Sequence, residues 1–161
     1  MPDILKDLHI DLIVSGVRAS SLRQALRISL EDLSLSPKKD GAIDVAFIFE
    51  QLMERETHVS SAIGGGLAMP NMIIDEIESP VSVLALLEKP LIYKTPDNIP
   101  VDMLCVVLSP DRMATKHLTR LSRLARFLKD PATRTNLQGS NDPRSAMELM
   151  LLPAGMTHLA A

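Results

Sequence analysis

Residues 63–72 read Ile-Gly-Gly-Gly-Leu-Ala-Met-Pro-Asn-Met and separate a helical first part of the chain from a strand-rich middle. Consecutive glycines allow positive φ angles, so they can bend a strand sharply or gather backbone N–H groups around an anion. The stretch lacks the G-x-G-x-x-G pattern of dinucleotide sites and the Gly-Lys-Ser/Thr of a phosphate loop. A structural bend and an anion cradle both stay open from these residues alone.

Two amphipathic helices are predicted before the glycines. The first begins near Ser21, because Ser21 and Gln24 fit a capping box and apolar residues then repeat at i, i+3 and i+4. Its predicted inward residues are Leu22, Ala25, Leu26, Ser29, Leu30 and Leu33. A turn over residues 37–41 leads to a second helix over residues 42–56. The predicted inward residues of that helix are Val45, Ile48, Phe49 and Leu52.

Strands and then helices are predicted after the glycines. Residues 81–87 and 101–108 are rich in Val and Leu and bounded by prolines, as covered strands are, with a loop or hairpin rim at 88–100. A long helix is expected to begin at residues 109–111, and a last helix near residue 142 that ends before Pro153. The predicted inward residues of the long helix are Leu118, Leu121, Ala125 and Leu128.

This order of elements predicts an α/β fold, a three-layer α/β/α sandwich around a mixed β-sheet. We expect a single domain over residues 1–161, with its core at about residues 20–152 and a loose tail at residues 153–161. The chain has 161 residues and 46% apolar content, which suits one globular domain with a core.

Composition excludes several classes of function. The formal net charge of −3 argues against a nucleic-acid partner. The single cysteine, Cys105, stands in an apolar run, so we expect a buried, inert thiol and a reducing compartment. The acidic beginning of the chain does not resemble a signal peptide, and no run is long and apolar enough for a membrane span. A cytoplasmic protein without membrane insertion is therefore expected.

Basic residues concentrate in the predicted long helix and just after it. Arg112, Lys116, Arg120 and Arg123 recur every three or four residues, which places them in one stripe. The stripe is either a solvated helix face or a docking surface for an acidic partner. His117 lies beside it, as a structural or a functional histidine. The histidines form no zinc-binding pattern, so neither a metal nor another cofactor is expected.

Together these motifs resemble a known family, the mannitol/fructose-type enzyme IIA domains (EIIA type 2) of the bacterial phosphoenolpyruvate-dependent phosphotransferase system. Residues 55–70 are similar to the family's Arg-Glu and glycine signature. Residues 90–108 are similar to its Pro-Val-Asp strand, and residues 116–125 to its His-Leu-x-x-Leu-Ser helix. The resemblance covers roughly residues 20–152 and is greatest for the stand-alone nitrogen-regulatory branch. It implies the phosphotransferase/anion-transport-protein-like fold.

The resemblance also implies a phosphorelay site with one substitution. In the family, a histidine directly after the glycine strand accepts a phosphoryl group, and this chain has Asn71 there. By the same resemblance, His117 is the second, assisting histidine and Arg55 binds the phosphate. The implied phosphate cradle consists of Ser61, Gly64, Gly65 and Gly66. An amide nitrogen has its lone pair delocalised into the carbonyl, so Asn71 argues against phosphotransferase activity.

Three functions stay in view. The first is a regulatory module that is not phosphorylated at residue 71 and docks an HPr-like phosphocarrier or a regulatory target protein through the basic stripe. The second is an active phosphocarrier with His117 as the acceptor. The third is a sensor of a small anion, bound by Arg55 and the glycine-strand amides. Relatives often pair, which allows a homodimer. In each case Asn71, His117 and Arg55 should meet in one shallow pocket.

Overall fold

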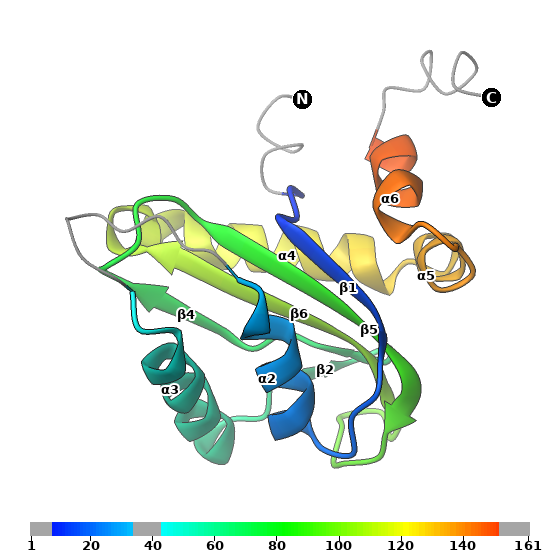
Figure 1. Ribbon diagram of the computed structural model, residues 1–161, viewed down its shortest axis with the longest axis horizontal. Coiled ribbons are helices and arrows are strands. Elements are labelled where there is room, and N and C mark those ends of the chain that lie inside the picture. Colours follow the sequence, from blue (N-terminus) through cyan, green and yellow to red (C-terminus); the bar gives the residue numbers. More distant parts are fainter. Residues whose placement is uncertain (1–7, 34–42, 152–161) are drawn as a thin grey trace.

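The computed structural model describes residues 8–33 and 43–151, and the turn expected at residues 37–41 and the tail at 153–161 lie outside them. Six strands form one mixed sheet in the order β1-β5-β6-β3-β2, with β4 also paired to β6 (Figure 1). β5 and β6 are antiparallel, as are β2 and β3, whereas β1 pairs in parallel with β5, and both β3 and β4 pair in parallel with β6. The strands are β1 Leu12–Val17, β2 Ala62–Gly64, β3 Leu67–Ala68, β4 Asn71–Ile74, β5 Val81–Leu91 and β6 Val101–Pro110.

Helices cover both faces of this sheet, as the three-layer prediction requires. α2 (Leu22–Glu31) and α3 (Val45–His58) lie on one face, and α4 (Ala114–Lys129) lies on the other (Figure 1). A short helical turn, η1 (Asp111–Met113), precedes α4, and α5 (Pro131–Gln138) and α6 (Pro143–Leu151) follow it. The predicted α/β fold with a mixed sheet is confirmed.

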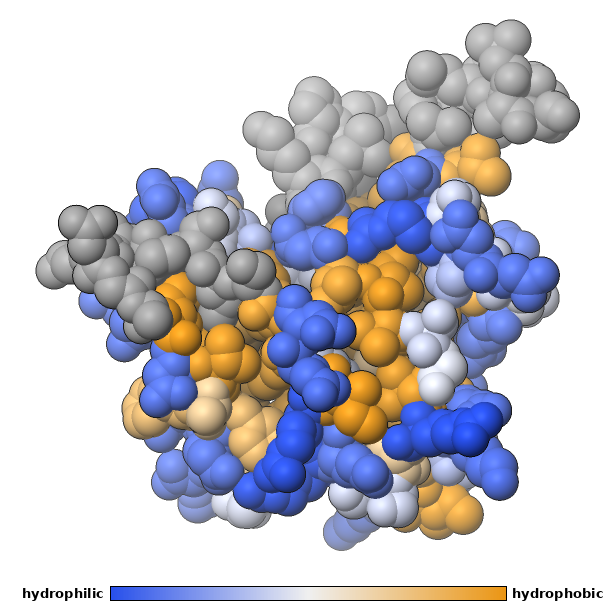
Figure 2. All heavy atoms as spheres, in the orientation of Figure 1, coloured by the Kyte–Doolittle hydropathy of each residue, from blue (hydrophilic) through white to orange (hydrophobic). Residues whose placement is uncertain are grey.

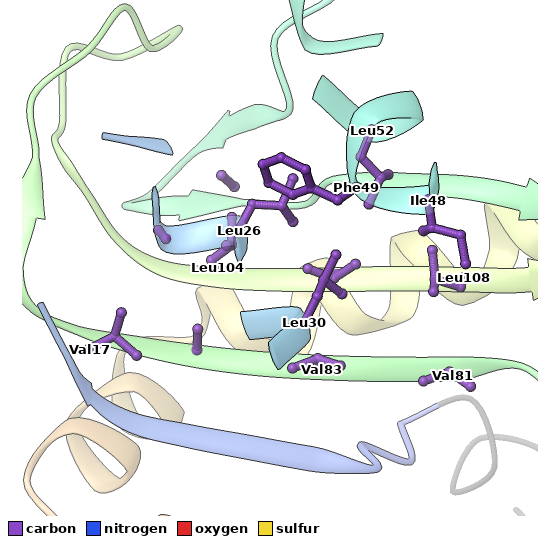
Figure 3. Packing of buried hydrophobic residues seen from close by; sticks show 14 of the residues in the cluster. Val17, Leu26, Leu30, Ile48, Phe49, Leu52, Val81, Val83, Leu104 and Leu108 are labelled. Atoms are coloured by element: carbon purple, nitrogen blue, oxygen red, sulfur yellow. The ribbon is translucent and has the colours of Figure 1, made fainter. Parts of the chain in front are cut away.

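The core consists of two apolar layers, one on each side of the sheet. Successive strand residues point to opposite faces, so Val83 joins the layer under α2 and α3 while Leu84 joins the layer under α4. Figure 3 shows Leu26 of α2 and Phe49 of α3 in the first layer, over the strands. Burial on both faces explains why β5 and β6 are almost continuously apolar.

The beginning of α2 agrees closely with the sequence. Ser21 is the N-cap, and its hydroxyl accepts a hydrogen bond from the Gln24 N–H at 3.1 Å. In a standard capping box the Gln24 side chain would accept from the N–H of the N-cap residue, Ser21. Here it accepts from the N–H of the preceding residue, Ser20, at 2.8 Å. The four inward residues that become fully buried are Ala25, Leu26, Ser29 and Leu30.

Three elements were not predicted: β1, β4 and α5. β1 contains the helix- and strand-breaking Gly16, β4 has only four residues, and α5 begins at Pro131 directly after α4. Because β1 belongs to the sheet and Ile10 before it is buried, the core begins well before residue 20, which corrects the expected boundary. β5 also continues to Leu91, into the segment expected to be a loop.

Leu118 does not belong to the inward face of α4. Its exposed fraction is 72%, whereas His117, Arg120, Leu124 and Leu128 are buried. Each helical residue turns the side chain by about 100°, so a face centred near Leu124 leaves Leu118 roughly a third of a turn away. The prediction followed leucine spacing alone and is wrong at this residue.

Cys105 lies in the middle of β6 and is completely buried, as predicted. Burial raises the pKa of its thiol to about 12, because the thiolate would lose its hydration, although the Arg120 charge acts in the opposite direction. Within the described residues, no helix has both the length and the apolar character that crossing a bilayer would need.

Candidate functional site

Asn71 and His117 meet where β4 begins and α4 completes its first turn. The Asn71 Nδ2 group donates to the Met69 carbonyl at 2.9 Å, which leaves Oδ1 directed at the imidazole. His117 Nε2 lies 3.0 Å from that oxygen, and His117 Nδ1 lies 2.6 Å from the Ser109 hydroxyl. Since an amide oxygen only accepts, Nε2 carries a proton, and in the neutral ring, which the lowered pKa of His117 favours, Nδ1 accepts from Ser109. The imidazole is therefore a neutral donor toward Asn71.

A buried arginine, Arg120, supports the contact between Asn71 and His117 through Ser109. Arg120 is only 4% exposed, and its guanidinium donates to the Leu108 carbonyl, the Ser109 hydroxyl and the Ser82 hydroxyl. Because Ser109 accepts from Arg120, its own hydrogen is left for His117 Nδ1. The hydrogen-bond chain therefore runs from Arg120 through Ser109 and His117 to Asn71. Neither serine was expected from the sequence, because no motif marks a hydroxyl at the end of a strand.

Burial of Arg120 corrects the predicted docking stripe. Arg120 points into the protein and cannot contact a partner, while Arg123 is half-buried. Arg112 and Lys116 are exposed, and Arg112 also donates to the Glu78 carbonyl at 2.7 Å. A basic surface at the start of α4 is therefore smaller than the spacing indicated.

The pKa of His117 is lowered, first by burial and then by the charges of Arg120 and Arg55. Below the ordinary pKa of 6.5, the unfolded chain binds a proton at this residue while the folded chain resists it. Stability should therefore be full above that pH and fall as the pH decreases toward the lowered pKa. We expect urea unfolding at about pH 7.5, 6 and 5 to show this loss, and His117→Gln to lose less. An equal or steeper loss in His117→Gln would contradict this assignment.

A pocket of about 280 Å³ opens beside Asn71, between the end of α3 and the segment before β4. The residues around it are Leu52, Arg55, Glu56, His58, Val59, Ser60, Ser61, Pro70 and Asn71. Arg55 lowers the pKa of His117, so its charge reaches the imidazole. Asn71 and Arg55 thus border one pocket, and His117, which is not among the residues around it, adjoins it through its contact with Asn71. Glu56 fixes the rim by accepting the Ser61 N–H at 3.0 Å.

A second, shallower pocket lies on the other side of Asn71, against α4. Its volume is also about 280 Å³, and apolar groups dominate it. The residues around it are Ser60, Ser61, Ile63, Met69, Asn71, Leu118, Leu121, Ser122 and Ala125. The exposed Leu118 thus belongs to an apolar surface that borders Asn71, a role that helical periodicity could not indicate.

Gly64 ends β2, Gly65 and Gly66 form the turn to β3, and none of the three lines either pocket at Asn71. All three have positive φ, and the Gly65 N–H donates to the Asp97 carboxylate at 2.8 Å. The Asp97 carboxylate thus accepts the hydrogen bond of the Gly65 N–H, which was expected to bind phosphate. Of the two alternatives for the glycines, the structure favours the structural bend over the anion cradle. Among the residues of the expected phosphate cradle, only Ser61 lines the pockets at Asn71.

Gly66→Ala should destabilise the chain more than Gly16→Ala. Both glycines have left-handed φ, +80° and +64°, so alanine is strained at either position. At Gly66 a Cβ would also meet Arg134 Nη2 at 2.7 Å and Asp102 Oδ1 at 2.9 Å, whereas nothing lies within 4 Å at Gly16. We expect losses of about 2–3 and about 1 kcal/mol respectively, measured by urea unfolding. Arg134 and Asp102 form an ion pair, and equal losses would show that it can move away from the new Cβ at no cost in stability.

Known proteins are similar to this chain in sequence and in fold. Residues 8–151 match the family "Phosphoenolpyruvate-dependent sugar phosphotransferase system, EIIA 2". A nitrogen regulatory protein of Bradyrhizobium diazoefficiens is 28% identical over 144 residues, covering 89% of this chain and 91% of the relative. The solved structure of nitrogen regulatory protein IIA-Ntr from Neisseria meningitidis has a TM-score of 0.73 and 20% identity, covering 88% of this chain and 92% of that one.

A further solved structure contains a partner protein. It is the complex of mannitol enzyme IIA with phosphorylated enzyme IIB from Escherichia coli, with a TM-score of 0.64 and 12% identity, covering 86% of this chain and 92% of that one. The fold and the match define a phosphotransferase-system EIIA domain of the second type. The chain belongs to the EIIA type 2 family, and the relative from Bradyrhizobium is a nitrogen regulatory protein.

Proposed function

We propose that this chain is a cytoplasmic regulatory protein of the nitrogen-regulatory EIIA type, which acts by binding other proteins and is not phosphorylated at residue 71. The observation that carries the proposal is the contact between Asn71 Oδ1 and His117 Nε2 at 3.0 Å. It supports the assignment of Asn71 to the place where the family has its phospho-acceptor. An amide there has no nucleophilic nitrogen, so it can receive a hydrogen bond but not a phosphoryl group.

His117 is a poor alternative acceptor. Its Nε2 donates to Asn71 and its Nδ1 accepts from Ser109, so both ring nitrogens are engaged. A phosphoryl group on either nitrogen would have to break a hydrogen bond that Arg120 supports from a buried position. This favours binding without chemistry over a relay through His117.

The surface around Asn71 suits a protein partner. Leu118 and Ile63 are exposed apolar residues beside the site, and Lys116 adds an exposed positive charge one residue before His117. Apolar contact supplies affinity, while charge steers the approach of an acidic partner. The mannitol enzyme IIA solved with phosphorylated IIB supports a protein partner for this fold. We assign an HPr-like carrier or a regulatory target to this surface, and a homodimer stays a prediction for sedimentation analysis to test.

A labelling experiment tests the proposal directly. The chain is incubated with labelled phosphoenolpyruvate, enzyme I and HPr or the nitrogen-branch carrier. We expect the carrier to be labelled and this chain to stay without acid-labile phosphate. Stoichiometric label on the chain would overturn the proposal, and its survival in His117→Gln would exclude His117 as the acceptor.

Binding is measured separately, by calorimetry with the unphosphorylated carrier. Leu118→Asp should weaken binding about tenfold or more, because it places a carboxylate in the apolar surface beside Asn71. Leu149→Asp serves as the matched control, since Leu149 is also an exposed leucine but belongs to α6. If both variants bind the carrier as the parent does, the docking surface is wrong.

A further inference from the structure

β4 has one unpaired side in the described part of the chain. It pairs with β6 in parallel, with Asn71 opposite Val107 and Ile73 opposite Ser109. The Val107 N–H donates to the Pro70 carbonyl at 3.0 Å, so Pro70, and then Met72 and Ile74, direct their backbone groups to β6. The N–H and C=O groups of Asn71 and Ile73 consequently face away from β6. No described strand pairs with that side.

A groove of about 430 Å³ runs between this edge and the first half of α3. The residues around it are Ile43, Asp44, Phe47, Ile48, Gln51, Met72, Ile73, Ile74, Asp75 and Glu76. Phe47 is 57% exposed and Ile73 is 42% exposed, although both are large apolar residues. In Figure 2, apolar atoms reach the surface in the region where Figure 1 places α3 and β4. An open main-chain edge thus adjoins an apolar groove.

The charges of the described residues at this groove have one sign. Asp44, Asp75 and Glu76 border it, and none of the described residues around it is Lys, Arg or His. Toward the end of α3 the groove gives way to the Arg55 pocket, because Gln51 and Leu52 are consecutive on α3 and Asn71 and Met72 are consecutive on β4. The groove is therefore acidic at the end of β4, whereas the adjoining pocket near Asn71 has both a cation, Arg55, and a carboxylate, Glu56.

We propose that the groove between β4 and α3 binds an extended segment of a partner protein, added as a strand to β4, in which apolar residues alternate with Lys or Arg. Main-chain hydrogen bonds to Asn71 and Ile73 would fix the register. Alternate side chains of the added strand point to one face, so every second residue reaches Phe47 and Ile73. The acidic border selects basic residues at the positions between them.

A second copy of this chain fits the groove less well. Its own β4 continues as Asn-Met-Ile-Ile-Asp-Glu, which offers no positive charge to the acidic border. A basic, extended segment of another protein meets both the open edge and the charge. Because Asn71 lies on this edge and also bonds His117, a bound segment would contact the candidate site from the face opposite to Leu118. The proposal goes beyond carrier docking and does not require residue 71 to be free of phosphate.

The test uses a randomised library of displayed octapeptides, selected on the whole chain. Enriched peptides should alternate apolar and basic residues. Synthetic copies should lose affinity about tenfold or more for Phe47→Asp and for Ile73→Lys, and stay within about twofold for Ile92→Lys. Ile92 is the matched control, because it is 91% exposed and lies outside the groove. Circular dichroism and Tm confirm that each variant is folded.

Backbone recognition is tested with the same peptides methylated at alternate amide nitrogens. N-methylation removes main-chain donors but keeps the side chains, so a β-added segment should bind about tenfold more weakly or worse. The proposal is overturned if no peptide is enriched, if the groove variants bind as the parent does, or if N-methylation in either register has no effect. Phosphate labelling of the parent chain would overturn the proposed function alone, so the two failures are distinguishable.

Discussion

Asn71→His is expected to convert the chain into a phosphoryl acceptor. A neutral imidazole at residue 71 has an in-plane lone pair that is nucleophilic near pH 7. His117 Nε2, which now donates to Asn71 Oδ1 at 3.0 Å, would donate to the new ring and orient it. Arg55 borders the same pocket and offsets the charge of the arriving phosphoryl group. In the transfer, the P–N bond to the carrier histidine breaks as a P–N bond to residue 71 forms.

Labelling of Asn71→His should rise from background to nearly one acid-labile phosphate per chain. The rate of labelling should rise about a hundredfold or more. Asn71→Gln is the matched control, since it keeps an amide and should stay unlabelled. Adding His117→Gln to Asn71→His should slow labelling, because the donor to the new imidazole has changed. Met72 stands where the family has glycine, so Asn71→His with Met72→Gly is tested as well. If both histidine variants bind the carrier and stay unlabelled, residue 71 is not the family's acceptor position.

Among alanine substitutions of the charged residues in α4, Arg120→Ala should cause the largest loss of stability. The guanidinium is 4% exposed and satisfies three buried acceptors from two strands, Leu108 O, Ser109 Oγ and Ser82 Oγ. Truncation removes those donors and leaves a cavity, for which we expect a loss of about 3 kcal/mol in the free energy of unfolding. Urea unfolding with an unchanged m-value measures it.

Arg126→Ala provides the comparison on the same helix. Arg126 is exposed in the last turn of α4, so its truncation should change stability by no more than about 0.5 kcal/mol. Arg120→Ala should also raise the pKa of His117 in an NMR titration, because the Arg120 charge is one cause of its lowering. A small stability loss for Arg120→Ala, similar to that of Arg126→Ala, would contradict the role assigned to its buried hydrogen bonds.

The contrast between Arg120 and Leu118 explains where sequence reasoning fails. Leucine spacing in α4 pointed Leu118 inward and arginine spacing pointed Arg120 outward, and both are reversed. The acceptors that make a buried arginine favourable belong to β5 and β6, so nothing within the helix announces them. Leu118 is exposed because the inward direction of α4 is set by contact with the sheet and not by its own leucines.

Long periodic elements were predictable and short ones were not. The capping residues of α2 and the apolar runs of β5 and β6 are local signals, and they led to the correct fold class. β4 has four residues after a proline, too few for a pattern, although it carries Asn71 and the open edge. The expectation that Asn71, His117 and Arg55 meet came from family resemblance. The binding of Gly65 to Asp97 depends on a contact 32 residues away, which no local motif encodes.

The completely buried Cys105 makes the chain its own reporter of sheet opening. Thiol reagents attack the thiolate, and a thiol with a pKa of about 12 at zero exposure supplies almost none in the native state. The rate at which Cys105 reacts in the native protein therefore reports how often β6 becomes exposed to solvent. No engineered label is needed, since this cysteine is the only one in the sequence. Ligands that rigidify the sheet can be ranked by how far they slow that reaction.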